Sequence, residues 1–239
     1  MASETPWQAL EQRISSDVKL SRRAVAVAFL DAVPSGMEQF KGTQPSSCSF
    51  WRLAAAGKSF FTVPENHFNC AVGAYTHNIP LSPACEKETE KTLKMMFDLG
   101  YVKPEEVPQI PRLHKTAAAI AYAPLGETSL TPDAVLFACK PAAAMLLNEG
   151  AAHAGIAGGS PVLGRPTCMA LPASQQAGSI LSLGCIGNRV YTGLGEDELY
   201  FVVRGQDLSA LADALEVIAD ANRALQQYAQ GRRTELASA

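Results

Sequence analysis

The chain has 239 residues, of which 47% are hydrophobic and 18% are charged, so it can bury a substantial core and is not expected to be disordered. This length fits one large domain or two small, closely packed halves. The formal net charge of −3 gives no general basic field, which argues against a nucleic-acid-binding protein.

The N-terminal residues carry early acidic side chains and no apolar core of a secretion signal, and the longest apolar stretch, TAAAIAYAPL, is too short to cross a bilayer. We therefore expect a cytoplasmic protein with no membrane partner. Its six cysteines are then free thiols or metal ligands, because a reducing compartment disfavours disulfides. No CxxC pair occurs, so any metal site gathers its ligands from distant parts of the chain.

Hydrophobic periodicity and the positions of proline predict alternating helices and strands. The predicted helices cover residues 5–18, 34–40, 82–99, 141–148 and 209–230. The predicted strands cover residues 24–30, 59–64, 134–138, 179–185 and 199–205. The stretch ENHFNCAVGAYTHN (65–78) is expected to be a polar loop because its glycine and asparagines disfavour a helix, and the tail RRTELASA is expected to fray.

The fold class predicted from this alternation is mixed α/β, built as two related α/β halves about a pseudo-twofold axis, with terminal helices. The first half comprises residues 1–110 with the N-terminal helix, and the second comprises residues 111–239 with the C-terminal helix. A passage with three prolines between residues 104 and 111 marks the connection, and the whole is expected to form one compact unit.

A weak internal repeat supports the two halves. The segment from Cys48 to Cys70 and the segment from Cys168 to Cys185 each contain an Ala-Gly pair followed by an apolar strand. After the second cysteine of each come a glycine and a Tyr-Thr pair, in CAVGAYT and CIGNRVYT. Upstream, AVAVAFLDAVPSGM and AVLFACKPAAAM share a strand, a proline and a methionine. If the halves are duplicates, packing about a twofold axis would bring the four cysteines together.

Four thiolates near one point repel each other unless a cation balances them, and soft sulfur ligands favour zinc or an iron–sulfur cluster. Structural zinc usually takes two ligands from a short knuckle, whereas the cysteines within each segment are 22 and 17 positions apart. We therefore predict a [4Fe–4S] cluster as the cofactor, with zinc or simple buried thiols as alternatives. The predicted ligands are Cys48, Cys70, Cys168 and Cys185.

Three further side chains near these cysteines are candidates for chemistry. His67 precedes a candidate ligand by three residues and is a candidate proton donor. Arg52 and Arg189 each follow a candidate ligand by four residues, so they would bind a small anionic molecule or offset the charge of a thiolate-ligated cluster. The alternative for all three is an ordinary structural hydrogen bond or ion pair.

The blocks SCSFWRLAAAGKSFFTVPENHFNCAVGAYTHN, GRPTCMALP and LSLGCIGNR resemble the family known as domain of unknown function 169, over about residues 25–203. The family name implies no reaction. The resemblance implies that the blocks around the four repeated cysteines are recurring signatures, whereas Cys85 and Cys139 lie outside them. Ser47 stands where a glycine is expected before the first cysteine, which weakens the case for close backbone approach there.

Three functions compete. The first is an iron–sulfur protein that transfers electrons to a redox partner or acts on a small anionic molecule. The second is a cofactor-free enzyme whose nucleophile is Cys70 with His67, or Cys139 at the start of a helix. The third is a non-catalytic module that binds a small anion or a tetrapyrrole. The sequence decides neither the substrate nor the oligomeric state, nor whether the protein is an enzyme.

Overall fold

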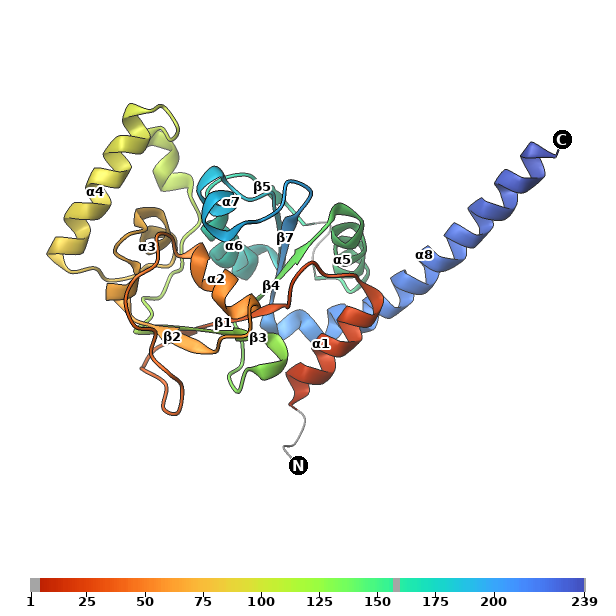
Figure 1. Cartoon of the computed structure of the whole chain (residues 1–239), viewed down its shortest axis with the longest axis horizontal. Coiled ribbons are helices and arrows are strands. Elements are labelled where there is room, and N and C mark those ends of the chain that lie inside the picture. The colour runs from red at the N-terminus through yellow and green to blue at the C-terminus, as the bar shows by residue number, and fades with distance from the viewer. Residues whose placement is uncertain (1–4, 157–159, 239) are drawn as a thin grey trace.

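The structure, a computed structural model, describes residues 5–156 and 160–238, and within them a seven-stranded sheet is covered by helices on both faces (Figure 1). The strand order is β2-β3-β1-β4-β7-β6-β5. Neighbouring strands are antiparallel except β5 and β6, which are parallel. The strands are β1 (Val25–Leu30), β2 (Phe60–Thr62), β3 (Ala119–Pro124), β4 (Ala134–Cys139), β5 (Val162–Leu163), β6 (Ser179–Ser182) and β7 (Leu199–Arg204).

The helices form one layer on each face of the sheet. They are α1 (Pro6–Asp17), α2 (Cys48–Ala55), α3 (Ala71–Thr76), α4 (Pro83–Asp98), α5 (Pro141–His153), α6 (Ala170–Ala177), α7 (Ile186–Thr192) and α8 (Leu208–Ala237). Short 3₁₀ turns are η1 (Pro64–His67), η2 (Pro104–Gln109), η3 (Leu125–Glu127), η4 (Thr167–Met169) and η5 (Gly205–Asp207). One apolar core lies between the sheet and α1, α5 and α8, and the other lies between the sheet and α2 and α6.

The central strands divide their side chains between these two cores because successive residues of a strand point to opposite faces. In β4, Val135 and Phe137 belong to the core with α5 and α8, whereas Leu136 and Ala138 belong to the core with α2 and α6. Every residue of β4 is buried, as expected for a strand covered by helices on both sides. No helix of the described residues is long and apolar enough to span a membrane.

Most elements agree with the sequence prediction, but three expectations were wrong. Residues 34–40 form turns rather than a helix, with Gly36 at a φ of 79° that interrupts any helical run. Residues 71–76 form α3 instead of a loop, because the Cys70 thiol accepts the backbone N–H of Gly73 and starts the helix. The C-terminal helix continues to Ala237 through the tail expected to fray. Residues 119–124, for which no element was predicted, form β3 between β1 and β2.

The order of elements follows the sequence repeat. The order strand, helix, strand, helix, strand occurs as β1, α2, β2, α3, β3 and again as β4, α6, β6, α7, β7. The helices α4 and α5 and the strand β5 lie outside this pattern. In the sheet, β1 and β4 are neighbours. From β1 the order continues outward through β3 and β2, and from β4 it continues outward through β7 and β6. Strand β3, which follows residue 110 in the chain, pairs with β1 and β2. A twofold axis that relates the halves stays a proposal.

Candidate functional site

Four short segments of the chain bring the predicted ligands to one region above the sheet. Cys48 is the first residue of α2, and Cys168 lies in η4 just before α6. Cys70 and Cys185 are the N-terminal capping residues of α3 and α7, and each thiol accepts a backbone N–H of its own helix, at 3.3 and 3.4 Å. The four are called the cysteine site below.

The packing joins these segments across the two halves. Helix α2 of the first half contacts α7 of the second, and α3 of the first half contacts η4 of the second. The segments carrying Cys48 and Cys185 are therefore neighbours, and so are those carrying Cys70 and Cys168. Within the second half, the Thr167 hydroxyl accepts the backbone N–H of Cys185 at 2.5 Å. The cysteine site thus lies at the contact between the halves.

The thiols lie close enough for their charges to interact. Burial is the main cause that raises the pKa of the Cys48 thiol, and charge on Cys168, Cys70 and Cys185 raises it further. Burial likewise raises the pKa of the Cys168 thiol, followed by charge on Cys70. Cys48 and Cys168 are 5% and 4% exposed, whereas Cys70 and Cys185 are half-buried, so the site has a buried end and an end open to solvent.

Within residues 5–156 and 160–238, no three histidine, cysteine, aspartate or glutamate side chains are grouped so that they could hold one metal ion. A zinc ion bound by four thiolates at about 2.3 Å would need sulfur atoms less than about 4 Å apart. The cysteine site therefore does not match a preformed zinc centre.

His67 links three elements beside the site through hydroxyl groups. Its Nε2 lies 2.8 Å from the hydroxyl of Thr62, which donates to the carbonyl of Ile120 at 3.2 Å. Thr62 therefore accepts from Nε2–H, which leaves Nδ1 to accept from the hydroxyl of Ser47 at 2.9 Å. Ser47 stands where a glycine was expected. Through its hydrogen bond to His67, which is bonded in turn to Thr62, it connects the start of α2 to β2. Neither ring nitrogen of His67 is hydrogen-bonded to a thiol.

The free energy of unfolding of the apoprotein is expected to fall as the pH drops from 7 to 5. Burial, followed by the charge of His77, lowers the pKa of His67 from 6.5 to about 3 in the folded protein. Between pH 6.5 and about pH 3, the imidazole of His67 is protonated in the unfolded chain but not in the folded protein. Acid therefore lowers the free energy of unfolding, by up to about 1.4 kcal/mol per pH unit for this group.

Urea unfolding at both pH values checks this expectation. The His67→Gln variant should show a shallower pH dependence than the wild type, whatever its absolute stability. His114 is exposed, so His114→Gln should keep the wild-type dependence. A pH dependence that survives unchanged in His67→Gln would contradict the assignment of a neutral, buried imidazole.

Several buried polar groups around the cysteine site have no hydrogen-bond partner among the described residues. Apart from the Thr89 hydroxyl, all such atoms belong to Trp51, His77, Tyr122 and Asn188. An unpartnered buried group costs about 1–3 kcal/mol, so native proteins rarely leave several in one place. Such a group of residues is typical of a site where a ligand, an ion or water supplies the missing partners.

These residues lie next to the thiols. The ring of His77 is beside the backbone of Cys168, and burial lowers its pKa to about 4. The amide of Asn188 lies against the thiol of Cys48. Burial raises the pKa of the Tyr122 hydroxyl, followed by the charge of Cys48. Sequence analysis missed this set, because a tyrosine in strand β3 and an asparagine in helix α7 carry no local signal of a site.

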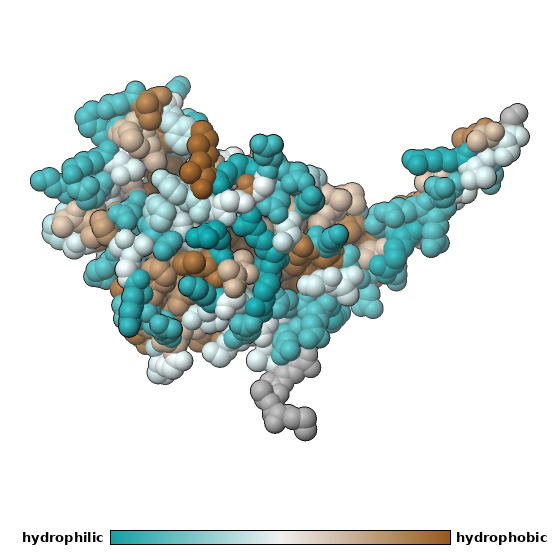
Figure 2. Space-filling view, viewed as in Figure 1, coloured by the Kyte–Doolittle hydropathy of each residue, from teal (hydrophilic) through white to brown (hydrophobic). Residues whose placement is uncertain are grey.

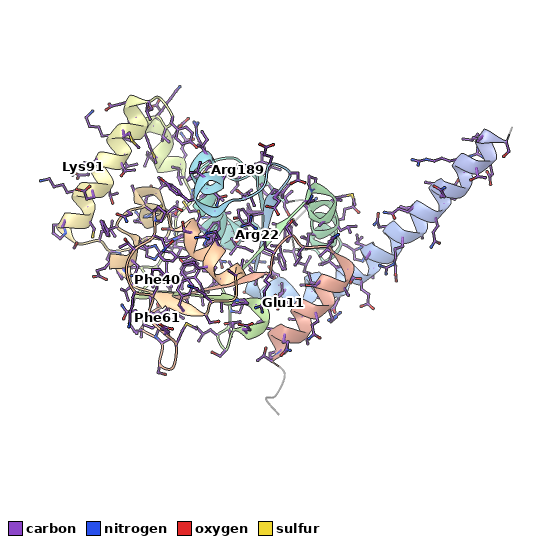
Figure 3. All side chains as sticks on the ribbon, in the orientation of Figure 1. Glu11, Arg22, Phe40, Phe61, Lys91 and Arg189 are labelled. Carbon is purple, nitrogen blue, oxygen red and sulfur yellow. The ribbon has the colours of Figure 1, made fainter. Side chains whose placement is uncertain are left out.

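The two arginines proposed to bind an anion have different surroundings. Arg52 is exposed on α2. Arg189, labelled in Figure 3, donates to the backbone carbonyl of Leu183, which precedes α7, and to those of Gly195 and Glu198, which follow it. Three of its five N–H groups therefore hold the segments on both sides of α7. A structural role for Arg189 is therefore better supported than anion binding.

Arg22 contacts the C-terminal end of α7. It donates to the carbonyls of Thr192 and Gly193 and pairs with the carboxylate of Glu198 at 3.3 Å (Figure 3). The last turn of α7 is thereby tied to the segment that precedes β1. This contact fixes the helix whose first residue follows a cysteine of the site.

The alternative nucleophile Cys139 is fully buried at the end of β4. Burial raises the pKa of its thiol to about 12, the opposite of the lowering expected from the start of α5. A thiolate is scarce at such a site, so the geometry does not favour Cys139 as a nucleophile. Cys85 lies in the first turn of α4, as expected, away from the repeat.

The fold defines an α/β protein with one central seven-stranded sheet, and four cysteines from separate segments lie in one region of it. The family model of domain of unknown function 169, described as an uncharacterised ArCR family, matches residues 13–214, and the chain belongs to this family. The resemblance seen in the cysteine blocks is thus confirmed. The chain is also 26% identical over 198 residues to an uncharacterized protein, MJ0308, of Methanocaldococcus jannaschii, covering 78% of this chain and 82% of that protein. No solved structure matches the chain.

Proposed function

We propose that the protein holds a [4Fe–4S] cluster at the cysteine site and uses it to transfer electrons or to act on a small anionic molecule. The observation that carries the proposal is that four cysteines selected from two repeated sequence segments lie within reach of one another's charge. A cluster would supply one-electron transfer or an iron that acts as a Lewis acid.

The larger size of a cluster favours it over zinc at this site. In a [4Fe–4S] cluster each thiolate binds its own iron, so the four sulfur ligands stand further apart than around a single ion. Thiols that influence one another without forming a mononuclear centre are consistent with that spacing. The two half-buried cysteines would give the cluster an edge near solvent, which electron transfer to a redox partner requires.

The hydrogen-bond donors beside the thiols support a polar, sulfur-rich occupant. Backbone N–H groups of Gly73 and Asn188 already point at the thiols of Cys70 and Cys185. The indole N–H of Trp51 and the hydroxyl of Tyr122 have no partner among the described residues, so they are free to donate to cluster sulfides. Hydrogen bonds to sulfur are among the features that set the potential of such clusters.

Metal analysis of protein made and purified without oxygen tests the proposal. We expect about four iron and four acid-labile sulfide per chain, a brown colour, and an electron paramagnetic resonance signal after reduction by dithionite. Protein reconstituted with iron and sulfide should reach the same content. A colourless protein without iron before and after reconstitution would refute the cluster, and one zinc per chain would select the zinc alternative.

A further inference from the structure

Two helices at the cysteine site place a polar side chain beside a thiol of the other half of the chain. Asn188 belongs to α7, which contacts α2, and its amide lies against the thiol of Cys48 in α2. Thr76 belongs to α3, which contacts η4, and its hydroxyl lies beside the thiol of Cys168 in η4. Each of the two buried thiols therefore faces a polar group that the opposite half supplies.

Both polar side chains are shielded from water. Figure 2 shows a mixture of hydrophilic and hydrophobic side chains on the face in view, and Asn188 and Thr76 lie beneath the surface, with 2% and 0% exposed. Neither polar atom of the Asn188 amide has a hydrogen-bond partner among the described residues. The hydroxyl of Thr76 donates to the carbonyl of Gly73 within its own helix, at 3.2 Å. A buried amide without partners is costly, so the site calls for a group that the amide can bind.

The charge on the neighbouring sulfur decides whether it is such a group. A neutral thiol is a weak hydrogen-bond acceptor. A thiol that binds a metal loses its proton, and the resulting negative charge makes the sulfur a strong acceptor. An N–H of Asn188 would then have a charged partner, and the O–H of Thr76 would have one that competes with the carbonyl of Gly73.

We infer, on the basis of the proposed cluster, that Asn188 and Thr76 donate hydrogen bonds to the buried ligand sulfurs of the opposite half and thereby raise the reduction potential of the cluster. Asn188 donates to Cys48, and Thr76 donates to Cys168. Reduction adds an electron to a site that already carries four thiolates, and a donor at a ligand sulfur stabilises the added negative charge. The potential therefore depends on the contact between the two halves as well as on the four cysteines.

Redox titration of the iron-loaded protein, followed by electron paramagnetic resonance, tests the inference. Asn188→Leu and Thr76→Val each remove the donor and keep a side chain of similar size. At the wild-type midpoint potential, the ratio of reduced to oxidised cluster should fall at least about threefold in each variant, a shift of about 30 mV to more negative potential for one electron. The double variant Thr76→Val/Asn188→Leu should shift further than either single variant.

Thr192→Val is the matched control for the threonine variant. Thr192 ends the Tyr-Thr pair of α7 as Thr76 ends that of α3, and it is 1% exposed. Its hydroxyl donates to the backbone carbonyl of Asn188 at 2.7 Å rather than facing a thiol. The same exchange there should leave the potential unchanged. The sign is a second check, because looser packing would admit water, which stabilises the reduced cluster and raises the potential.

Iron and sulfide content of the same samples separates the donors from the cluster itself. Wild-type protein without iron overturns both the inference and the proposed cluster. Full iron content with a wild-type potential in Asn188→Leu and Thr76→Val overturns only the inference, and so does an equal shift in Thr192→Val. Thr76→Val is the smaller change, so its potential decides alone where Asn188→Leu assembles no cluster.

Discussion

Replacing Cys168 with serine is expected to abolish most iron binding, leaving less than about a quarter of the wild-type iron and sulfide in protein made without oxygen. A buried alcohol is a poor ligand for iron. Burial disfavours a charged side chain at residue 168, and the proposed cluster would offset this cost for a thiolate but not for a serine. Cys48→Ser should behave alike, because Cys48 occupies the corresponding buried place in the first half.

Cys85→Ser is the matched control for these variants. Cys85 lies at the start of α4, outside the site, and the same exchange of sulfur for oxygen there should leave the iron content at the wild-type level. Melting curves of the metal-free proteins separate loss of ligand from loss of fold. Full iron content in Cys168→Ser with normal stability, or equal losses in Cys85→Ser, would rule out the assigned ligands.

Gly73→Ala is expected to destabilise the protein by about 1–3 kcal/mol, because the site has no room for one more carbon. A Cβ at residue 73 would lie 2.2 Å from the hydroxyl oxygen of Ser47 and 2.9 Å from the thiol of Cys70. The glycine thus lets α3 approach the start of α2. Urea unfolding of the metal-free variant measures its free energy of unfolding. The iron content after reconstitution shows whether the displaced thiol of Cys70 still binds iron.

A double-mutant cycle isolates the cause. Ser47→Gly removes the obstructing side chain and, with it, the hydrogen bond to His67. The free energy of unfolding of this single variant should therefore fall by about 1 kcal/mol. The double variant Ser47→Gly/Gly73→Ala should lose less free energy of unfolding than the sum of the losses in the two single variants. Gly187→Ala, in the corresponding region of α7, meets nothing within 4 Å and should be neutral or slightly stabilising. Additive losses in the double variant would exclude the steric explanation.

The sequence predicted elements where local chemistry is strong. Thr5 caps α1 and Ser82 caps α4 through their side-chain oxygens, and both helices begin within one residue of the expected position. The strand β3 was not recognised, because its alanine-rich residues carry little strand preference. Those small residues fit a strand that is buried on both faces and flanked by β1 and β2, a circumstance that only the assembled sheet creates.

The same distinction applies to the site. The repeat singled out the four cysteines, but it gave no indication of His77, Tyr122 or Asn188, whose unpartnered polar atoms depend on which segments surround them. It also suggested an anion-binding role for Arg189, which in the folded chain holds backbone carbonyls. A side chain's spacing from a cysteine does not tell which groups will compete for its hydrogen bonds.

The sequence by itself determined the family and the alternation of helices and strands, and it singled out four cysteines as candidate ligands. These depend on residues a few positions apart, or on comparison of one segment with another. Tertiary structure alone decided that α2 contacts α7, that α3 contacts η4, and that the thiols share one half-buried region. Contacts between segments distant in the chain arise from packing two cores on one sheet, and no local pattern of residues encodes them.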